Sequence, residues 1–149
     1  MRKLLLCAVV CAMPAIAAAA SPSSRSIALD VRDAPSSGAD GYTDTTASNG
    51  KVYSYKYSGG DKGGGDVTFT GRGAGTVVVH LRGSRYAIDS VDFPDDPNDQ
   101  LSDDASASSP TSAVIKDKND TVQTATYKVT VKDSSADATV PCDPKIINN

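Results

Sequence analysis

The stretch that decides the fold class is TVVVHLRGSRYAIDSV, residues 76–91. Apolar side chains recur at every second position on both sides of the dipeptide formed by Gly83 and Ser84. A glycine in the first position of a two-residue connection suits a type II′ turn. Such a turn places Val79 opposite Ile88, so that the apolar side chains of both halves share one face. The stretch therefore predicts a half-buried antiparallel β-hairpin.

Further period-two patterns lie on both sides of this stretch. They are SIALDVR (26–32), KVYSYKYS (51–58), DVTFTG (66–71), AVIKDKND (113–120) and TVQTATYKVTVKD (121–133). Outside the first 20 residues, no window spaces its apolar residues as an amphipathic helix does. About seven short strands joined by turn-rich segments predict an all-β fold, an antiparallel immunoglobulin-like β-sandwich.

The beginning of the chain, MRKLLLCAVVCAMPAIAAAA, has the order of a cleaved secretory signal: two basic residues, an apolar run, then small residues. The apolar run is shorter than the roughly 20 residues that a membrane span needs. We therefore expect a signal peptide over 1–20 and a periplasmic or secreted protein that does not span the membrane. Residues 21–50 are expected to form a loop-rich segment with one strand, and residues 51–149 the body of the β-sandwich.

Removal of the signal leaves an acidic chain. The sequence has 15 lysines and arginines and 18 acidic residues, and the loss of Arg2 and Lys3 leaves 13 basic residues and a net charge of −5. All of the acidic residues are aspartates, which favour turns over helices. A negative surface argues against a nucleic acid as partner.

Three tyrosines alternate along one predicted strand: Tyr53, Tyr55 and Tyr57. One interpretation is a flat platform that binds sugar rings or peptide, because a phenol offers an apolar face and a polar tip. The other is the buried side of an edge strand. The chain has no tryptophan, the strongest stacking residue, which weakens the sugar interpretation.

An acidic loop follows the predicted hairpin and carries Asp95, Asp96, Asp99, Asp103 and Asp104. Calcium takes six to eight oxygen ligands, and a loop dense in carboxylates offers several. The spacing is not that of an EF-hand, and acidic loops are usually only solvated. The sequence therefore predicts no cofactor: a plain solvated loop is the favoured interpretation, and a calcium site is the alternative.

Cys142 is the only cysteine that remains after the signal is removed, and it lies between Pro141 and Pro144 near the end of the chain. Because proline cannot donate a ladder hydrogen bond, this stretch is expected at the edge of a sheet. An unpaired cysteine in an oxidising compartment suggests an intermolecular disulfide. The other interpretation, which the apolar neighbours Val140, Ile146 and Ile147 favour, is a buried thiol that packs as a small apolar side chain.

Three stretches together resemble the DP-EP family of small bacterial proteins, namely residues 76–93, residues 125–133 and the tail CDPKIINN at 142–149. In the tail the resemblance depends on Asp143, Pro144, Ile146 and Asn148. The resemblance covers residues 76–149 and implies a β-sandwich fold. Because the family has no established activity, the resemblance implies none for this chain.

The sequence supports two hypotheses about function. The first is a small exported, non-catalytic binding or interaction module for a protein or a glycan, which uses the tyrosine row or loop tips on a rigid sandwich. The second is a structural envelope component that assembles or dimerises through its C-terminal strand and Cys142. An enzyme is not expected, because no nucleophile–base pair and no metal set is present in the sequence.

Overall fold

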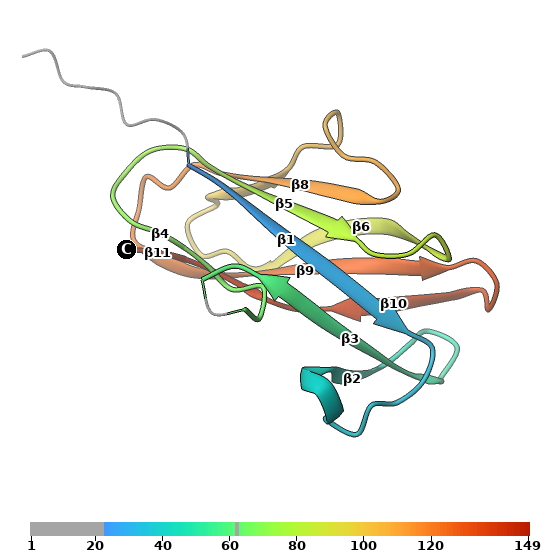
Figure 1. The fold of residues 1–149 in the computed structure, drawn as a ribbon. Coiled ribbons are helices and arrows are strands. Elements are labelled where there is room, and N and C mark those ends of the chain that lie inside the picture. Colours follow the sequence, from blue (N-terminus) through green and yellow to red (C-terminus); the bar gives the residue numbers. More distant parts are fainter. Residues whose placement is uncertain (1–22, 62) are drawn as a thin grey trace, which may run out of the picture.

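A computed structural model describes residues 23–61 and 63–149, so the predicted signal peptide over 1–20 lies outside the described residues. The fold is all-β, with two sheets packed against each other (Figure 1), and it confirms the predicted β-sandwich. The described residues form eleven strands, more than the seven that the sequence patterns suggest. Within the described residues there is no helix long and apolar enough to cross a membrane.

The first sheet has six strands, and a short 3₁₀ helix, η1 (Ala39–Gly41), precedes its edge strand β2. Neighbouring strands are antiparallel, except that β1 and β5 are parallel. In spatial order the strands are β2 (Thr43–Thr46), β3 (Val52–Gly59), β1 (Ser23–Arg32), β5 (Gly75–Leu81), β8 (Ser112–Asp117) and β7 (Leu101–Asp103).

The second sheet has five strands and is built around the long strand β9. On one edge of β9 lie β10 and then β11, and on its other edge lies β6. The short strand β4 pairs with β11 in parallel. The bounds are β4 (Val67–Phe69), β6 (Tyr86–Asp95), β9 (Gln123–Asp133), β10 (Ala138–Cys142) and β11 (Lys145–Asn148).

The core lies between the two sheets, and the period-two patterns mark it correctly. The side chains predicted to point inward on β1, β4 and β9 are at most 4% exposed. Burial of each such side chain favours folding by about 1.5–3 kcal/mol before chain entropy is counted. The set comprises Ile27, Leu29, Val31, Val67, Phe69, Tyr127, Val129 and Val131.

The predicted hairpin over residues 76–91 is wrong, because its two halves belong to different sheets. In β5, Val79 pairs with Ile27 of β1, whereas in β6, Ile88 pairs with Val131 of β9. Alternation states which side of a strand is buried, but two strands that face each other across a core have the same alternation as two neighbours in one sheet. The connection at 82–85 therefore crosses from one sheet to the other.

The predicted boundary at residue 50 does not separate two parts of the fold. The strand β1 lies inside the six-stranded sheet, between β3 and β5 (Figure 1). The edge strand β2 adds a second strand to the segment that was expected to hold one. Residues 23–50 are thus part of the sandwich, because the partners of β1 come from far along the chain.

Candidate functional site

The tyrosine row on β3 faces the space between the sheets, and two of its members belong to the core. Tyr53 is 1% exposed and Tyr57 is 5% exposed, whereas Tyr55 is only partly buried. The hydroxyl of Tyr53 donates to Oδ2 of Asp133 at 3.1 Å, and that of Tyr57 donates to the carbonyl of Cys142 at 3.1 Å. The row is therefore no continuous platform, and Tyr55 is the member that a ligand can reach.

Tyr55 borders a surface hollow of about 310 Å³, which we call the Tyr55 hollow. The hollow lies at an open side of the sandwich, where β3 of one sheet approaches the turn between β10 and β11 of the other. Its walls come from four segments that are distant in sequence. The lining residues are Gly41, Thr43, Tyr55, Lys56, Tyr57, Gly63, Gly64 and Asp143.

A strand edge runs along this hollow. The partner β1 follows β3 from Ser54 to Gly59, but the outer partner β2 follows it only from Val52 to Tyr55. Beyond Tyr55, β3 therefore has no strand partner on its outer edge within the described residues. Backbone donors and acceptors on such an edge are free to pair with another extended chain.

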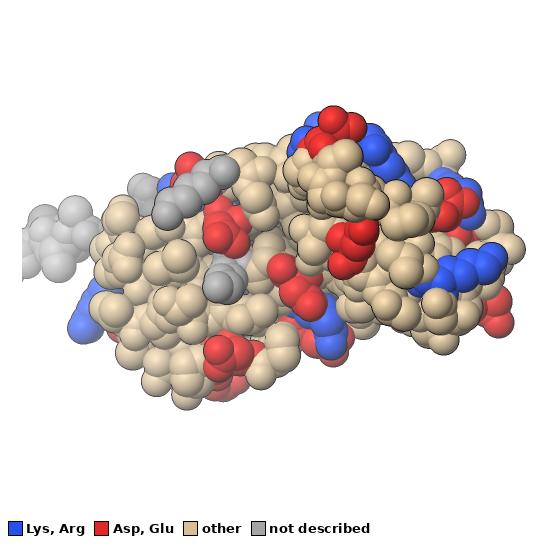
Figure 2. Space-filling view, turned by 90° about the horizontal axis from the view of Figure 1, so that it is seen from below, with Lys and Arg blue, Asp and Glu red and all other residues tan. Residues whose placement is uncertain are grey.

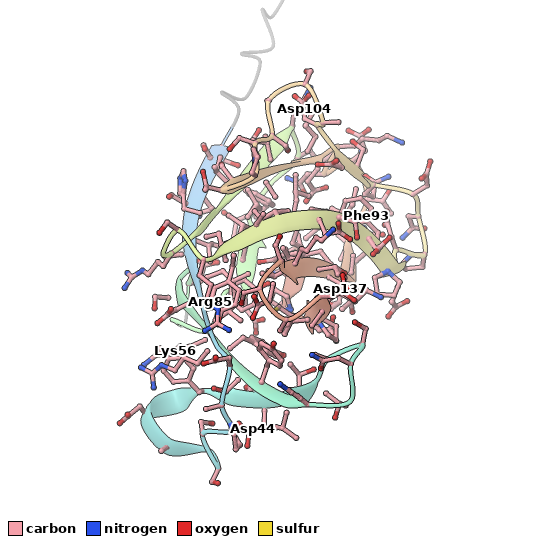
Figure 3. All side chains as sticks on the ribbon, turned by 90° about the vertical axis from the view of Figure 1, so that its right-hand side faces the viewer. Asp44, Lys56, Arg85, Phe93, Asp104 and Asp137 are labelled. Carbon is pink, nitrogen blue, oxygen red and sulfur yellow. The ribbon has the colours of Figure 1, made fainter. Side chains whose placement is uncertain are left out.

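The polar groups around Tyr55 come from both sheets. The hydroxyl of Tyr55 accepts a hydrogen bond from the backbone N–H of Asp143 at 3.4 Å, and burial raises the pKa of this phenol, so it stays protonated at neutral pH. The ring of Tyr55 meets that of Tyr57 edge-on, with centroids 5.9 Å apart. In Figure 3, Lys56 lies beside the η1–β2 segment, where its Nζ donates to the carbonyl of Asp40 at 2.6 Å.

Glycines shape the far rim of the hollow. A Cβ on Gly65 would come within 2.7 Å of the Tyr57 ring, so this glycine lets the loop between β3 and β4 lie directly on the core. The carbonyl of Gly65 accepts the hydroxyl of Tyr127 at 3.1 Å, which fixes the loop from the other sheet. A Cβ on Gly63 or Gly64 would meet no atom within 4 Å, so these two residues present bare backbone to the hollow.

The acidic loop does not assemble the calcium site that was the alternative interpretation. Within the described residues, no three carboxylate, histidine or cysteine side chains form a group that could hold a metal ion. The carboxylates have other partners: Asp99 contacts Lys118 at 3.4 Å, Asp103 accepts from Ser108, and Asp104 contacts Lys116 at 2.7 Å. The ion pair with Lys116 and a bond from Ser106 lower the pKa of Asp104 to about 2.

Asp96 has a structural role in the same segment. Its two oxygens accept the backbone N–H groups of Gln100 at 3.1 Å and Leu101 at 2.8 Å, and Gln123 donates from its amide at 2.8 Å. Partial burial raises the pKa of Asp96, but these hydrogen bonds outweigh it and leave the pKa below its ordinary value. Asp95 is the last residue of β6, where it pairs with Thr126. Asp96 thus orders the turn into β7, and within the described residues the five aspartates do not converge on an ion.

Cys142 is fully buried, and the intermolecular disulfide is therefore not supported. Its Sγ lies 3.8 Å from the carbonyl of Val140, and burial together with the nearby Asp143 raises the pKa of the thiol. The strand β10 is at the edge of its sheet, as the two prolines predict. That edge is covered, because Ser48 donates to the carbonyl of Thr139 at 3.0 Å and accepts its N–H at 2.9 Å.

A second hollow, of about 240 Å³, lies between β6 and the loop from β7 to β8. Asp89 and Asp103 line it together with serines and small apolar side chains, and no aromatic ring takes part. On the face shown in Figure 2, acidic and basic side chains alternate with larger uncharged areas, and neither sign forms a continuous patch.

Sequence patterns identified Tyr55 but missed most of the residues that surround it. Lys56, Asp143 and the glycines were not predicted to belong to a site. The run GGDKGGGD directly after the tyrosine strand is the one signal that points to them, since bare backbone next to an aromatic strand marks a place of close approach.

Comparison with known proteins does not assign this chain to a family. No protein-family model matches the chain, and no curated protein matches it.

Proposed function

We propose that this protein is a small exported binding module without a catalytic step, and that the Tyr55 hollow binds an extended segment of a partner polypeptide. The observation that carries the proposal is the coincidence of a half-buried aromatic side chain with an open strand edge. The edge begins at Lys56, directly after the last residue that β2 covers. An incoming strand would continue the line of β2 along β3.

The chemistry of the hollow supports an extended main chain as the ligand. In strand addition, backbone hydrogen bonds supply affinity and side-chain pockets supply specificity. The edge of β3 offers the first, and the bare backbone at Gly63 and Gly64 leaves room for a chain to approach. The ring of Tyr55 offers an apolar contact, and Lys56 and Asp143 provide one charge of each sign at the rim.

The same residues argue for binding rather than catalysis. The hydroxyl of Tyr55 is bonded to a backbone N–H, and no histidine or cysteine lines the hollow. The single histidine of the chain, His80, is exposed on β5. A nucleophile with a base in hydrogen-bond reach, the arrangement that acyl-transfer chemistry requires, is not part of the proposed site.

Export is the second component of the proposal, and it depends on residues 1–20. Their sequence has the features of a secretory signal, and the mature protein is expected in the periplasm or outside the cell. The resemblance of residues 143–148 to the tail of the DP-EP family remains a prediction and adds no activity. Assembly through the C-terminal strand is the less favoured function, because β11 has a strand partner on each edge, β9 and β4. In addition, Ser48 covers the edge of β10 and Cys142 is buried.

Binding of the mature protein to immobilised random peptides and to a glycan array tests the proposal. We expect selected peptides to bind, and Tyr55→Ala to weaken them at least about tenfold, or about 1.4 kcal/mol. Gly64→Leu should do the same by filling the hollow, since its backbone is unstrained and its Cβ meets open space. Lys51→Ala, an exposed change directly before β3 and at the opposite end from the hollow, is the control and should leave binding unchanged.

Two results would contradict the proposal. Binding of glycans alone would replace the extended peptide by another ligand class. Peptide binding that survives both Tyr55→Ala and Gly64→Leu would locate the interaction elsewhere on the molecule.

A further inference from the structure

Two polar side chains from different sheets, Asp117 and Asn148, contact each other in the interior. Their strands, β8 and β11, end at the side of the sandwich where β1 begins (Figure 1). Asp117 is the last residue of β8 and Asn148 the last of β11, and each is only 1% exposed. Nδ2 of Asn148 donates to Oδ1 of Asp117 at 3.1 Å. The same oxygen accepts the backbone N–H of Asn119 at 2.8 Å.

The remaining two atoms of this pair are buried and lack partners. Oδ2 of Asp117 and Oδ1 of Asn148 have no hydrogen-bond partner among the described residues. If the carboxyl group were ionised, both atoms would be acceptors and neither could satisfy the other. Buried polar atoms are almost always hydrogen-bonded. A hydrogen atom between Oδ2 of Asp117 and Oδ1 of Asn148 would give both atoms a partner.

We propose that Asp117 is protonated in the folded protein and that its Oδ2–H donates to Oδ1 of Asn148. A carboxylic acid and a primary amide each offer one donor and one acceptor side by side. The pair then closes a ring of two hydrogen bonds, one of which is already present, and both orphan atoms are satisfied. The proton comes from the solvent, so folding takes up one proton at pH values between the ordinary and the raised pKa of Asp117.

The surroundings of Asp117 favour its neutral form. Its partners across the sheet, Gly75 of β5 and Leu101 of β7, carry no charge. Neither do the partners of Asn148, which are Phe69 of β4 and Gln123 of β9.

The charged groups that act most strongly on Asp117 are both negative. They are Asp96 from the segment between β6 and β7 and Asp120 from the segment between β8 and β9. The two lysines that flank Asp117 in sequence are engaged elsewhere, Lys116 with Asp104 and Lys118 with Asp99. Burial above all, and then these two carboxylates, raise the pKa of Asp117, against the hydrogen bonds from Asn119 and Asn148.

The pair makes the link between the sheets depend on pH. The pKa of Asp117 in the folded protein lies above its ordinary value of 3.8. The stabilisation is therefore fully present below 3.8 and is lost as the pH rises through the raised pKa. Above that pH the folded protein either holds a buried carboxylate or loosens this end of the sandwich.

Asp117→Asn tests the proposal, because an amide keeps both hydrogen bonds at every pH. We expect the folding constant of Asp117→Asn to lack the pH dependence that protonation of Asp117 gives the wild type. Between the ordinary and the raised pKa, the wild-type folding constant should fall tenfold per pH unit relative to Asp117→Asn, measured by urea unfolding. Asp89→Asn removes one exposed carboxylate from β6 and is the matched control, which should retain the wild-type slope.

The carboxyl carbon of Asp117 gives a direct readout in the wild-type protein, whether or not the variant folds. Its NMR chemical shift should titrate with a midpoint above 3.8. A midpoint at or below that value would overturn the proposal. So would a wild-type stability that rises with added sodium, potassium or calcium and loses this dependence in Asp117→Asn, because a cation would then bridge the two oxygens.

Discussion

At the scale of single residues, Asp133 is a buried carboxylate that joins three parts of the fold. Its Oδ2 accepts the hydroxyl of Tyr53 at 3.1 Å and Nη2 of Arg85 at 2.8 Å, while Oδ1 accepts two bonds from Ser135. Burial raises its pKa, but these bonds outweigh burial and lower the pKa to about 2. Its stabilisation is thus present above 3.8 and is lost as the pH falls towards 2, opposite in sign to that of Asp117.

Asp133→Ala is expected to reduce the free energy of unfolding by about 2 kcal/mol, because it removes charged hydrogen bonds from a buried site. Arg85 is 44% exposed and recovers part of its hydration, which limits the loss. The control is Asp33→Ala, which removes the other partner of Arg85, a carboxylate that is 49% exposed. That change should cost less than about 1 kcal/mol in urea unfolding, and equal losses for the two variants would contradict the assignment.

Cys142 supplies a second prediction at this scale. Its sulfur is fully buried and burial raises its pKa, so the reactive thiolate is scarce in the folded state. We expect the folded protein to resist a thiol reagent and to react fully once it is unfolded in urea. It should run as a monomer in electrophoresis without reductant. Rapid labelling of the folded protein, or a dimer that reductant dissolves, would restore the disulfide hypothesis.

At the scale of elements, β6 is a long edge strand with features that discourage it from pairing with a strand of another molecule. Among the described residues its one strand partner is β9, and the pairing shifts at two irregularities, between Ile88 and Ser90 and between Asp92 and Asp95. Charged residues, prolines and bulges on an edge discourage pairing with another molecule. Asp89 and Pro94 contribute two of these features.

The double change Asp89→Val and Pro94→Val should therefore promote aggregation more than it lowers stability. Light scattering during refolding is the measurement, and urea unfolding reports the stability. Asp120→Val, in the segment between β8 and β9, removes the same charge from an exposed position outside any strand and serves as control. If the double variant scattered no more light than the control during refolding, Asp89 and Pro94 would not be needed to keep β6 from pairing with another molecule.

We expect that the acidic loop, residues 95–104, does not bind calcium. Its aspartates accept hydrogen bonds from their own turn or contact lysines, and they form no metal group within the described residues. A ligand that binds only the native state raises its stability by mass action. The melting temperature should therefore be the same in millimolar calcium and in a chelator, and a rise with calcium would require a rearranged loop.

At the scale of the whole molecule, the C-terminal strand completes the second sheet. β11 lies between β9 and β4, and Ile146 is fully buried. Removal of residues 145–149 should leave β4 without a partner and expose the core at Val67 and Phe69, so the chain should fail to fold cooperatively. Circular dichroism and urea unfolding measure this. Conversion of Ile147, a partly exposed residue of the same strand, to Thr is the control and should leave a folded protein.

The candidate site shows which of its features the alternation of residues can predict and which it cannot. Alternation places Tyr53, Tyr55 and Tyr57 on one face, and the structure agrees that all three turn towards the other sheet. Alternation does not distinguish the two that are buried from the one that borders a hollow. That difference arises because β2 ends at Tyr55 and because Asp143 approaches from the other sheet.

The sequence by itself determined the all-β class and the inward face of most strands, because period-two burial is a local property of an extended chain. Only the tertiary structure decided which strands are neighbours. Residues 76–91 cross between the sheets, and β1 pairs in parallel with β5. Pairing of this kind depends on contacts between residues far apart along the chain. The Tyr55 hollow and the Asp117–Asn148 pair depend on the same long-range contacts, since each joins segments that have no common local pattern.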